Sequence, residues 1–140
     1  MPKAKRRSGH QAQWAAQFAV ASELCKRGYE VAFTLGHNTP LADLMVISPR
    51  RKSFLIDVKG LSGRNPWILK RKKLRAGLYY VLAYVPRDET NRFFILSQRQ
   101  ANNLVAKHFE RPSKRKKPGW DGFLFNAPAH HENKWRSLPR

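Results

Sequence analysis

The chain has few acidic residues, a single cysteine and no long apolar run. The last two features exclude disulfide-bonded, cysteine-zinc and membrane-spanning proteins. Asp and Glu together number 9 against 28 Lys and Arg in 140 residues. The lone Cys25 rules out an intrachain disulfide and a cysteine-based zinc site, and we expect it to be a buried core thiol. No stretch approaches the roughly 20 apolar residues that a membrane helix needs. We therefore expect a cytoplasmic protein without a membrane span.

Positive charge is what the sequence has in excess. The formal net charge is +19 and the isoelectric point is near 11.0. Such a charge favours a polyanionic partner, because each phosphate that is neutralised releases condensed counterions. Hydrophobic residues make up 41% of the chain, which is ordinary for a globular core. The composition therefore predicts one folded domain that binds nucleic acid, with DNA as the expected partner.

The hydrophobic pattern predicts an α/β domain. A helix is expected over residues 10–27, with Gly28 as its stop and an apolar stripe formed by Trp14, Phe18, Ala21, Leu24 and Cys25. A second helix over residues 97–110 begins at Ser97 as N-cap. Alternating apolar runs predict the strands, at 29–35, 41–48, 53–59, 78–85 and 92–96. We divide the chain into a flexible basic arm (1–9), the domain (10–110), and a basic linker with a C-terminal extension that packs on the domain (111–140).

Two acidic residues lie inside apolar, strand-like runs. Asp43 is found in LADLMVIS and Asp57 in FLIDVKG, with Lys59 two positions further on. An ionised carboxylate in such surroundings is costly unless something binds it. Side chains alternate along a strand, so Asp57 and Lys59 share one face. The pattern fits either a metal-dependent phosphodiesterase site or an edge hairpin whose Asp57–Lys59 pair is merely solvated or salt-bridged.

A tight hairpin would bring the two acids together. If it closes symmetrically about Arg50, Asp43 faces Asp57, whereas a two-residue turn would shift the register by one. Directly opposed like charges destabilise a sheet, and a divalent cation between them converts repulsion into binding. We expect Mg²⁺, with Mn²⁺ as a substitute, held by both carboxylates and activating water for attack on a phosphate. Lys59 is then the catalytic lysine, which orients the water or stabilises the pentavalent centre.

The first helix supplies a further candidate. At about 100° per residue, Gln17 falls on the apolar stripe while Glu23 points almost opposite, towards solvent. A polar residue on a buried stripe is informative. Gln17 is therefore expected to meet the sheet near the acids, either as part of the catalytic site or as an amide that bonds backbone groups.

The order of elements, together with these residues, resembles the PD-(D/E)XK, or restriction-endonuclease-like, nuclease superfamily. TPLADLMV carries the first acid, IDVKG carries the Asp-x-Lys, and QFAVASELCKRGYEVAF is similar to the family's first helix and strand. The resemblance implies an α-β-β-β-α-β core with a central mixed sheet flanked by helices. It further implies DNA endonuclease activity, Val58 as an additional metal ligand, and Gln17 at a position where many members have Glu. A homodimer is compatible with it, because many relatives of this fold dimerise.

Basic clusters are the expected nucleic-acid contacts. We assign phosphate binding to three groups of residues: Lys70, Arg71, Lys72 and Lys73; Arg6 and Arg7; and Lys114, Arg115, Lys116 and Lys117. Trp67 either stacks on a base or, as we prefer, caps the core. The run His130-His131-Glu132 lacks the further ligands that zinc needs, so we expect it at the surface.

Two other functions remain open at this point. The neutral Gln17 favours a catalytically weak or inactive nucleic-acid-binding protein that retains the nuclease fold. Charge alone would also fit a small ribosome-associated or RNA-binding protein, but that function leaves the apolar-flanked carboxylates unexplained. The sequence therefore favours a metal-dependent DNA endonuclease.

Overall fold

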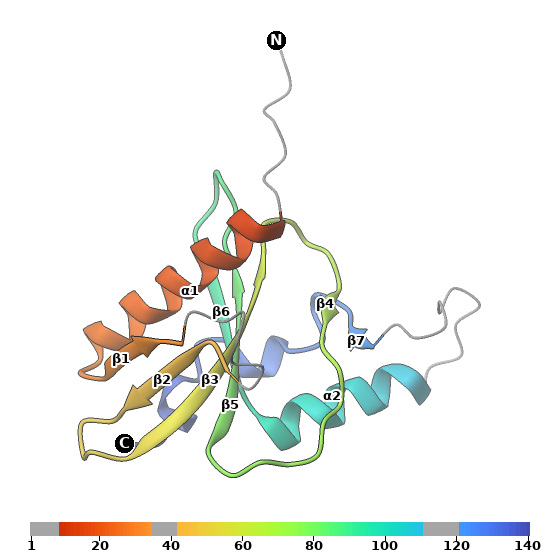
Figure 1. Cartoon of the computed structure of the whole chain (residues 1–140). Helices are drawn as coiled ribbons and strands as arrows, with labels where there is room; N and C mark the ends of the chain where they lie inside the picture. Colours follow the sequence, from red (N-terminus) through yellow and green to blue (C-terminus); the bar gives the residue numbers. More distant parts are fainter. Residues whose placement is uncertain (1–8, 35–41, 111–120) are drawn as a thin grey trace.

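The computed structural model describes residues 9–34, 42–110 and 121–140, and its centre is a five-stranded mixed sheet (Figure 1). The strand order is β1-β2-β3-β5-β6, and of its neighbouring pairs only β3 and β5 run parallel. The strands are β1 (Glu30–Phe33), β2 (Leu44–Ile47), β3 (Ser53–Leu61), β5 (Leu78–Tyr84) and β6 (Arg92–Ser97). The expected α/β class, with a central mixed sheet flanked by helices, is confirmed.

The end of the first helix and the beginning of the second are set by local sequence signals. Helix α1 (Gly9–Lys26) stops where Gly28, at φ 87°, donates to Cys25 O and Tyr29 N–H donates to Leu24 O. This is a Schellman motif, which glycine favours because it has no Cβ. Helix α2 (Gln98–Glu110) begins with a capping box in which Ser97 and Gln100 bond each other's backbone N–H. Neither described helix combines the length and apolar character needed to cross a bilayer.

The two faces of the sheet carry two separate cores. One core packs α1 and the C-terminal residues Trp135 and Leu138 against one face of the sheet. The other packs α2 and the aromatic residues Trp67, Phe123 and Phe125 against the opposite face. Alternation along β3 sends Ile56 and Val58 into the first core. Asp57 and Lys59 therefore lie on the second face, as the sequence predicts.

The buried stripe of α1 differs from the predicted one. Ala21 and Leu24 are buried as expected, but Phe18 is 58% exposed and Cys25 is exposed, so the predicted core thiol is wrong. The remaining buried residues, Ala12, Ala16 and Val20, are small or β-branched and lie nearer the start of the helix. A Cβ added at Gly60 would lie 2.6 Å from Ala16 Cβ and 2.8 Å from Ala12 O. The helix thus packs directly on the backbone of β3, which a stripe of large side chains would prevent.

The β2–β3 hairpin closes symmetrically, as the placement of the acids requires. Ile47 pairs with Ser53 and Leu44 with Ile56. Arg51 has φ 65° and donates its N–H to Ser48 O at 2.8 Å. A turn followed by a residue in the left-handed region is a common three-residue hairpin loop. The ladder ends at the Leu44–Ile56 pair, and the Asp43 N–H also bonds Ile56 O, so the predicted pairing of Asp43 with Asp57 is not part of the ladder.

The parallel strands β3 and β5 are joined by a connection without a helix, where the α-β-β-β-α-β order implied by the resemblance has one. It contains β4 (Trp67–Ile68), which pairs with β7 (Gly122–Phe123), and then residues 69–75, which form neither helix nor strand and which we call the strap. In Figure 1 the strap runs beside α2 before the chain turns into β5. Side chains of α2 hold it: Gln98 bonds Lys73 O and Arg75 N, and Asn102 bonds Lys72 O.

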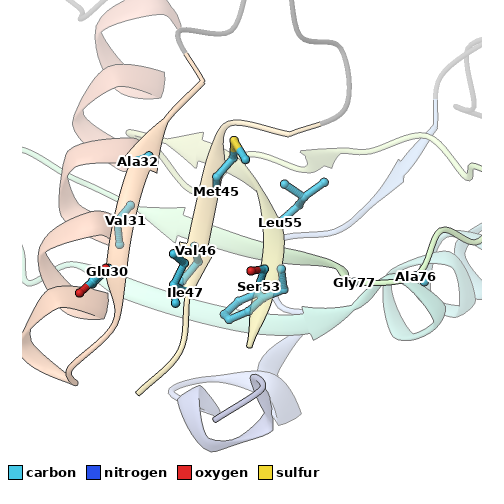
Figure 2. A pocket seen from close by; sticks show the side chains of 11 residues that line it. Glu30, Val31, Ala32, Met45, Val46, Ile47, Ser53, Leu55, Ala76 and Gly77 are labelled. Atoms are coloured by element: carbon cyan, nitrogen blue, oxygen red, sulfur yellow. The ribbon is translucent and has the colours of Figure 1, made fainter. Parts of the chain in front are cut away.

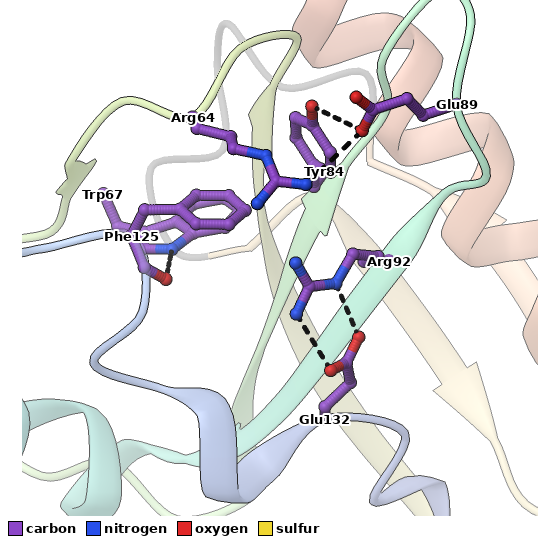
Figure 3. A network of polar contacts seen from close by, with 7 residues as sticks. All are labelled: Arg64, Trp67, Tyr84, Glu89, Arg92, Phe125 and Glu132. Atoms are coloured by element: carbon purple, nitrogen blue, oxygen red, sulfur yellow. Dashed lines mark hydrogen bonds and ion pairs between the residues drawn. The ribbon is translucent and has the colours of Figure 1, made fainter.

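The C-terminal segment is tied to the sheet by ion pairs and aromatic stacking (Figure 3). The Arg92 guanidinium donates two hydrogen bonds to the Glu132 carboxylate, in a bidentate pair at 2.8 and 3.0 Å. Phe125 stacks on the Trp67 indole with centroids 5.7 Å apart, and Trp67 Nε1 donates to Phe125 O. Short helical turns, η1 (Ala129–His131) and η2 (Trp135–Ser137), complete the segment. It is this packing that fixes β7, and through β7 the start of the strap.

Candidate active site

Asp43 lies directly before β2, where the chain leaves the regular ladder. Its N–H donates to Ile56 O at 3.0 Å, and its carbonyl accepts from Thr34 N at 3.0 Å. Its carboxylate turns towards β3, where Oδ2 accepts the Val58 N–H at 2.8 Å. Gln17 of α1 donates from Nε2 to Oδ1 at 3.4 Å, as the helical periodicity predicts. The first acid is therefore held by groups from a helix and two neighbouring strands.

The electrostatics of Asp43 are those of a carboxylate held partly out of water. Burial raises the pKa of its carboxyl above the ordinary value. The hydrogen bond from Val58 works against this rise, the nearby charge of Asp57 adds to it, and Lys59 opposes it. Two acids and a lysine thus act on one another at this end of β3.

Asp57 is the more deeply buried acid, with only 7% of its surface exposed. Its Oδ1 lies 3.1 Å from Lys59 Nζ. That contact lacks hydrogen-bond alignment, so Oδ1 accepts no hydrogen bond within the described structure. A buried carboxylate oxygen left in this state is costly. The atom is thus suited to receive a ligand that supplies positive charge.

Gln13 is a site residue that the sequence analysis missed. Its Nε2 donates to Val58 O at 2.7 Å, and its Oε1 accepts from Gly60 N at 3.1 Å. The amide takes the place of a neighbouring strand along the edge of β3 that β2 no longer covers. The signal was available, because Gln13 lies one helical turn before Gln17 and shares its face. The prediction named Gln17 on this face and did not include Gln13.

A cavity of about 210 Å³ opens beside Asp57 on the second face of the sheet. Lys59 and Tyr80 line it from β3 and β5, and Lys70 and Lys72 line it from the strap. Tyr80 is 1% exposed, and burial, with a smaller contribution from Asp57, raises the pKa of its hydroxyl to about 12. The phenol therefore stays neutral and can donate a hydrogen bond near neutral pH. Part of the predicted basic cluster thus lines the same cavity as Asp57.

Comparison with solved structures shows the same fold in a nuclease. The chain superimposes on the structure of a bacterial homing endonuclease, I-Ssp6803I, with a TM-score of 0.58 and 17% identity. The match covers 94% of this chain and 91% of the other. The chain shares that fold. No protein-family model matches the sequence, and no curated protein matches it either.

The other predicted nucleic-acid contacts do not line the cavity, or lie outside the described residues. Trp67 is 1% exposed and stacked on Phe125, so the preferred core position is correct and the alternative, base stacking, is wrong. Arg71 and Lys73 are exposed but do not line the cavity. Glu132 is engaged by Arg92, and His130 is exposed. The other predicted contacts fall outside the described residues: Arg6, Arg7, Lys114, Arg115, Lys116 and Lys117.

The donor set fits a hard divalent cation that keeps most of its water. Among the described residues no group of three or more Asp, Glu, His or Cys side chains could hold a metal. Asp43 and Asp57 form a pair of carboxylates, and Mg²⁺ is commonly held by one or two carboxylates plus water and phosphate. The side chain of Val58 has no donor atom, so only its carbonyl, which already accepts from Gln13, could contribute. The residues present are compatible with Mg²⁺ and poorly suited to zinc.

A larger hollow of about 430 Å³ lies elsewhere, across β1, β2 and β3 (Figure 2). Its lining is mainly apolar, and Glu30 is alone among its lining residues in carrying a charge. Met45 and Ile47 beside it are 56% and 42% exposed. This hollow lacks the cations that a phosphodiester needs. The smaller cavity at Asp57 is therefore the candidate active site.

Proposed function

We propose that the protein is a Mg²⁺-dependent endonuclease that hydrolyses phosphodiester bonds in DNA. The observation that carries the proposal is the buried Asp57 Oδ1, which has no hydrogen bond and lies next to Lys59 and near the partly desolvated Asp43. A divalent cation at the two carboxylates would offset their mutual repulsion. It would also give Asp57 Oδ1, which accepts no hydrogen bond, a positively charged partner. The fold shared with a homing endonuclease and the charge of +19 support DNA as substrate.

In this mechanism Asp43 and Asp57 hold the cation, and the Val58 carbonyl is a further candidate ligand. When bound, Mg²⁺ supplies charge stabilisation at the phosphate and a more acidic attacking water. The water oxygen would form a bond to phosphorus and release a proton to solvent, the bond from phosphorus to the leaving sugar oxygen would break, and that oxygen would take up a proton from solvent. Lys59 donates from its ammonium group to a phosphate oxygen, where negative charge grows in the transition state.

The glutamines have supporting roles. Gln17 fixes the rotamer of Asp43 through Oδ1, and Gln13 fixes the backbone of residues 58–60 on which Asp57 and Lys59 are mounted. A neutral Gln17 adds no charge to the cation site. One bound cation per site is therefore the arrangement we propose.

The test is cleavage of labelled duplex, branched and single-stranded DNA, and of RNA, with Mg²⁺ or Mn²⁺. Asp43→Asn, Asp57→Asn and Lys59→Ala should each lower the rate by more than about 100-fold, because even changes one shell away from a metal cost 10- to 100-fold. DNA binding should be retained. Glu30→Gln, which removes an equal charge far from the cavity, should cleave at the wild-type rate. Undiminished cleavage by both aspartate variants would overturn the proposal.

The second candidate is a nucleic-acid-binding protein without catalytic activity. The neutral Gln17 and the two-carboxylate donor set favour it. It predicts tight DNA binding together with the absence of cleavage of every substrate at millimolar Mg²⁺ or Mn²⁺. The homodimer stays a prediction, which sedimentation of the full chain with and without duplex DNA will decide.

A further inference from the structure

The cavity beside Asp57 has the charge of an anion site. Its charged lining consists of the ammonium groups of Lys59, Lys70 and Lys72 against the single carboxylate of Asp57. Lys59 is already in contact with that carboxylate at 3.1 Å, which leaves the two lysines of the strap to face the cavity. Ammonium groups gathered around a small cavity attract phosphate, because every new contact is charge-assisted.

The strap divides its four consecutive basic residues into two pairs. Lys70 and Lys72 line the cavity, whereas Arg71 and Lys73 do not. This alternation follows from the extended backbone, in which side chains two positions apart point the same way. The sequence alone shows one uniform basic run. The structure shows that Lys70 and Lys72 alone among the four line the cavity beside Asp57.

Helix α2 and strand β7 hold the strap backbone in place. Gln98, itself only 4% exposed, donates from Nε2 to Lys73 O at 3.0 Å and accepts from Arg75 N at 2.6 Å. Asn102 donates to Lys72 O at 2.9 Å, and Leu69 N–H donates to Asp121 O at 3.1 Å. An irregular segment with backbone bonds at both ends presents its side chains in a defined direction.

We propose that the strap is a phosphate clamp, in which Lys70 and Lys72 grip the phosphodiester group to be cut and Gln98 is the positioning residue. Tyr80, which also lines the cavity, donates its hydroxyl to the same group. The inference rests on the proposed nuclease function for the identity of the ligand. Its binding test does not depend on catalysis, so the two can fail separately.

The first experiment measures binding of a labelled 30-base-pair DNA duplex by fluorescence anisotropy in EDTA, over a range of salt concentrations. The double variant Lys70→Ala/Lys72→Ala should flatten the slope of log K against log salt by about 1, because the two lysines contact one phosphate and each phosphate contact contributes about 0.9. The matched control Arg71→Ala/Lys73→Ala removes the same charge from the same segment. It should leave the slope close to that of wild type. Equal slopes for the two pairs would overturn the clamp.

The second experiment measures single-turnover cleavage at saturating DNA with Mg²⁺. Lys70→Ala/Lys72→Ala should slow the step by about 100-fold, the scale found when one donor to a transition-state oxyanion is removed. The control pair should stay within about threefold of wild type. If no DNA is cut by wild type, the proposed function fails, and the salt slopes alone decide whether the clamp stands.

The third experiment tests Gln98 as a positioning residue. Gln98→Ala should flatten the salt slope as the lysine pair does, and adding Lys70→Ala/Lys72→Ala to it should change the slope no further. Gln100→Ala removes a glutamine from the same helix and destabilises its cap without touching the strap. It should lower the melting temperature and leave the slope unchanged. A Gln98→Ala slope equal to that of Gln100→Ala would show a purely structural role.

Discussion

Helices α1 and α2 support opposite sides of the candidate site in the same way, each through a glutamine side chain that bonds backbone groups. Gln13 of α1 bonds Val58 O and Gly60 N, and Gln98 of α2 bonds Lys73 O and Arg75 N. In both cases one amide spans the carbonyl of a residue and the N–H two positions later. The side chain thus imitates a neighbouring strand along an edge that has none.

The segments held in this way differ. On the α1 side the segment is part of β3, a long strand inside the sheet, and it carries Asp57 close to the core. On the α2 side the segment is the strap, which has no ladder of its own and carries exposed lysines. The acids, whose geometry would have to be exact to hold the proposed cation, are thus built on the half that the sheet supports, the rigid half. The cations, which act at longer range, are built on the less supported half.

The largest effect on stability should come from Gly60→Ala, which disturbs the packing of α1 on β3. The new Cβ would lie 2.6 Å from Ala16 Cβ and 2.8 Å from a backbone atom, Ala12 O, so the helix has to move. We expect a loss of about 3 kcal/mol in the free energy of unfolding, as for other overpacked cores. Urea unfolding followed by circular dichroism measures it.

Two further glycines serve as comparisons for that variant. Gly9→Ala, on the same helix with nothing within 4 Å, should leave stability unchanged or raise it slightly. Gly122→Ala, at φ 153°, would press on Trp67 O and displace β4 on the α2 side. It should reduce DNA affinity together with stability. An unaltered unfolding midpoint for Gly60→Ala would show that α1 does not rest on β3.

A second effect compares the two glutamines directly. Gln13→Ala leaves Val58 O and Gly60 N without partners in a partly buried place, and should cost about 2 kcal/mol, near 1 for each hydrogen bond. Gln98→Ala should cost less, because water can reach the exposed strap. Both are measured by urea unfolding. A larger loss for Gln98→Ala would reverse the assignment of the rigid and the less supported half.

A third, pH-dependent effect concerns Asp43. Because burial raises its folded-state pKa above the unfolded value, ionisation of this group destabilises the fold. The penalty is absent below the ordinary pKa of Asp and grows as the pH rises through the folded-state pKa. Asp43→Asn should therefore be more stable than wild type at pH 7 and equally stable at pH 3.

Thermal unfolding across that pH range checks this behaviour, with Glu30→Gln as the control for an exposed carboxylate. A stability difference that grew on acidification would contradict the raised pKa. The same titration predicts that Mg²⁺ affinity falls on acidification at a pH above the one expected for an exposed aspartate, since only the ionised carboxylate binds the cation.

The smallest effect should come from Tyr80→Phe, on the strap side of the cavity. Removing one neutral hydrogen bond to phosphate costs about 1 kcal/mol, which is about fivefold in the cleavage rate. Tyr79→Phe, whose ring packs against Phe54 in the other core, is the matched control and should have no effect. Single-turnover cleavage distinguishes them. Equal rates for both variants would remove Tyr80 from the clamp.

Much of this arrangement could be predicted from the sequence, and the failures have physical causes. Alternation and turn symmetry were enough to predict the register of the β2–β3 hairpin and to put Lys59 beside Asp57. The stripe of α1 was misplaced because large side chains were expected at the contact, whereas Gly60 permits Ala12 and Ala16 to approach the strand backbone. The division of the strap lysines depends on an extended backbone held by residues about 30 positions away, which no local pattern reveals.

The parallel pairing of β3 and β5 has a consequence for the order of folding. The hairpin of β2 and β3, and the bonds by which α1 packs on it, use only residues up to Gly60. The strap cannot be held so early, because it needs β5, β6 and α2 already in place. During synthesis the N-terminal segments leave the ribosome first. A chain emerging from the ribosome would therefore possess its acidic half before its basic half, and would complete the proposed phosphate clamp last.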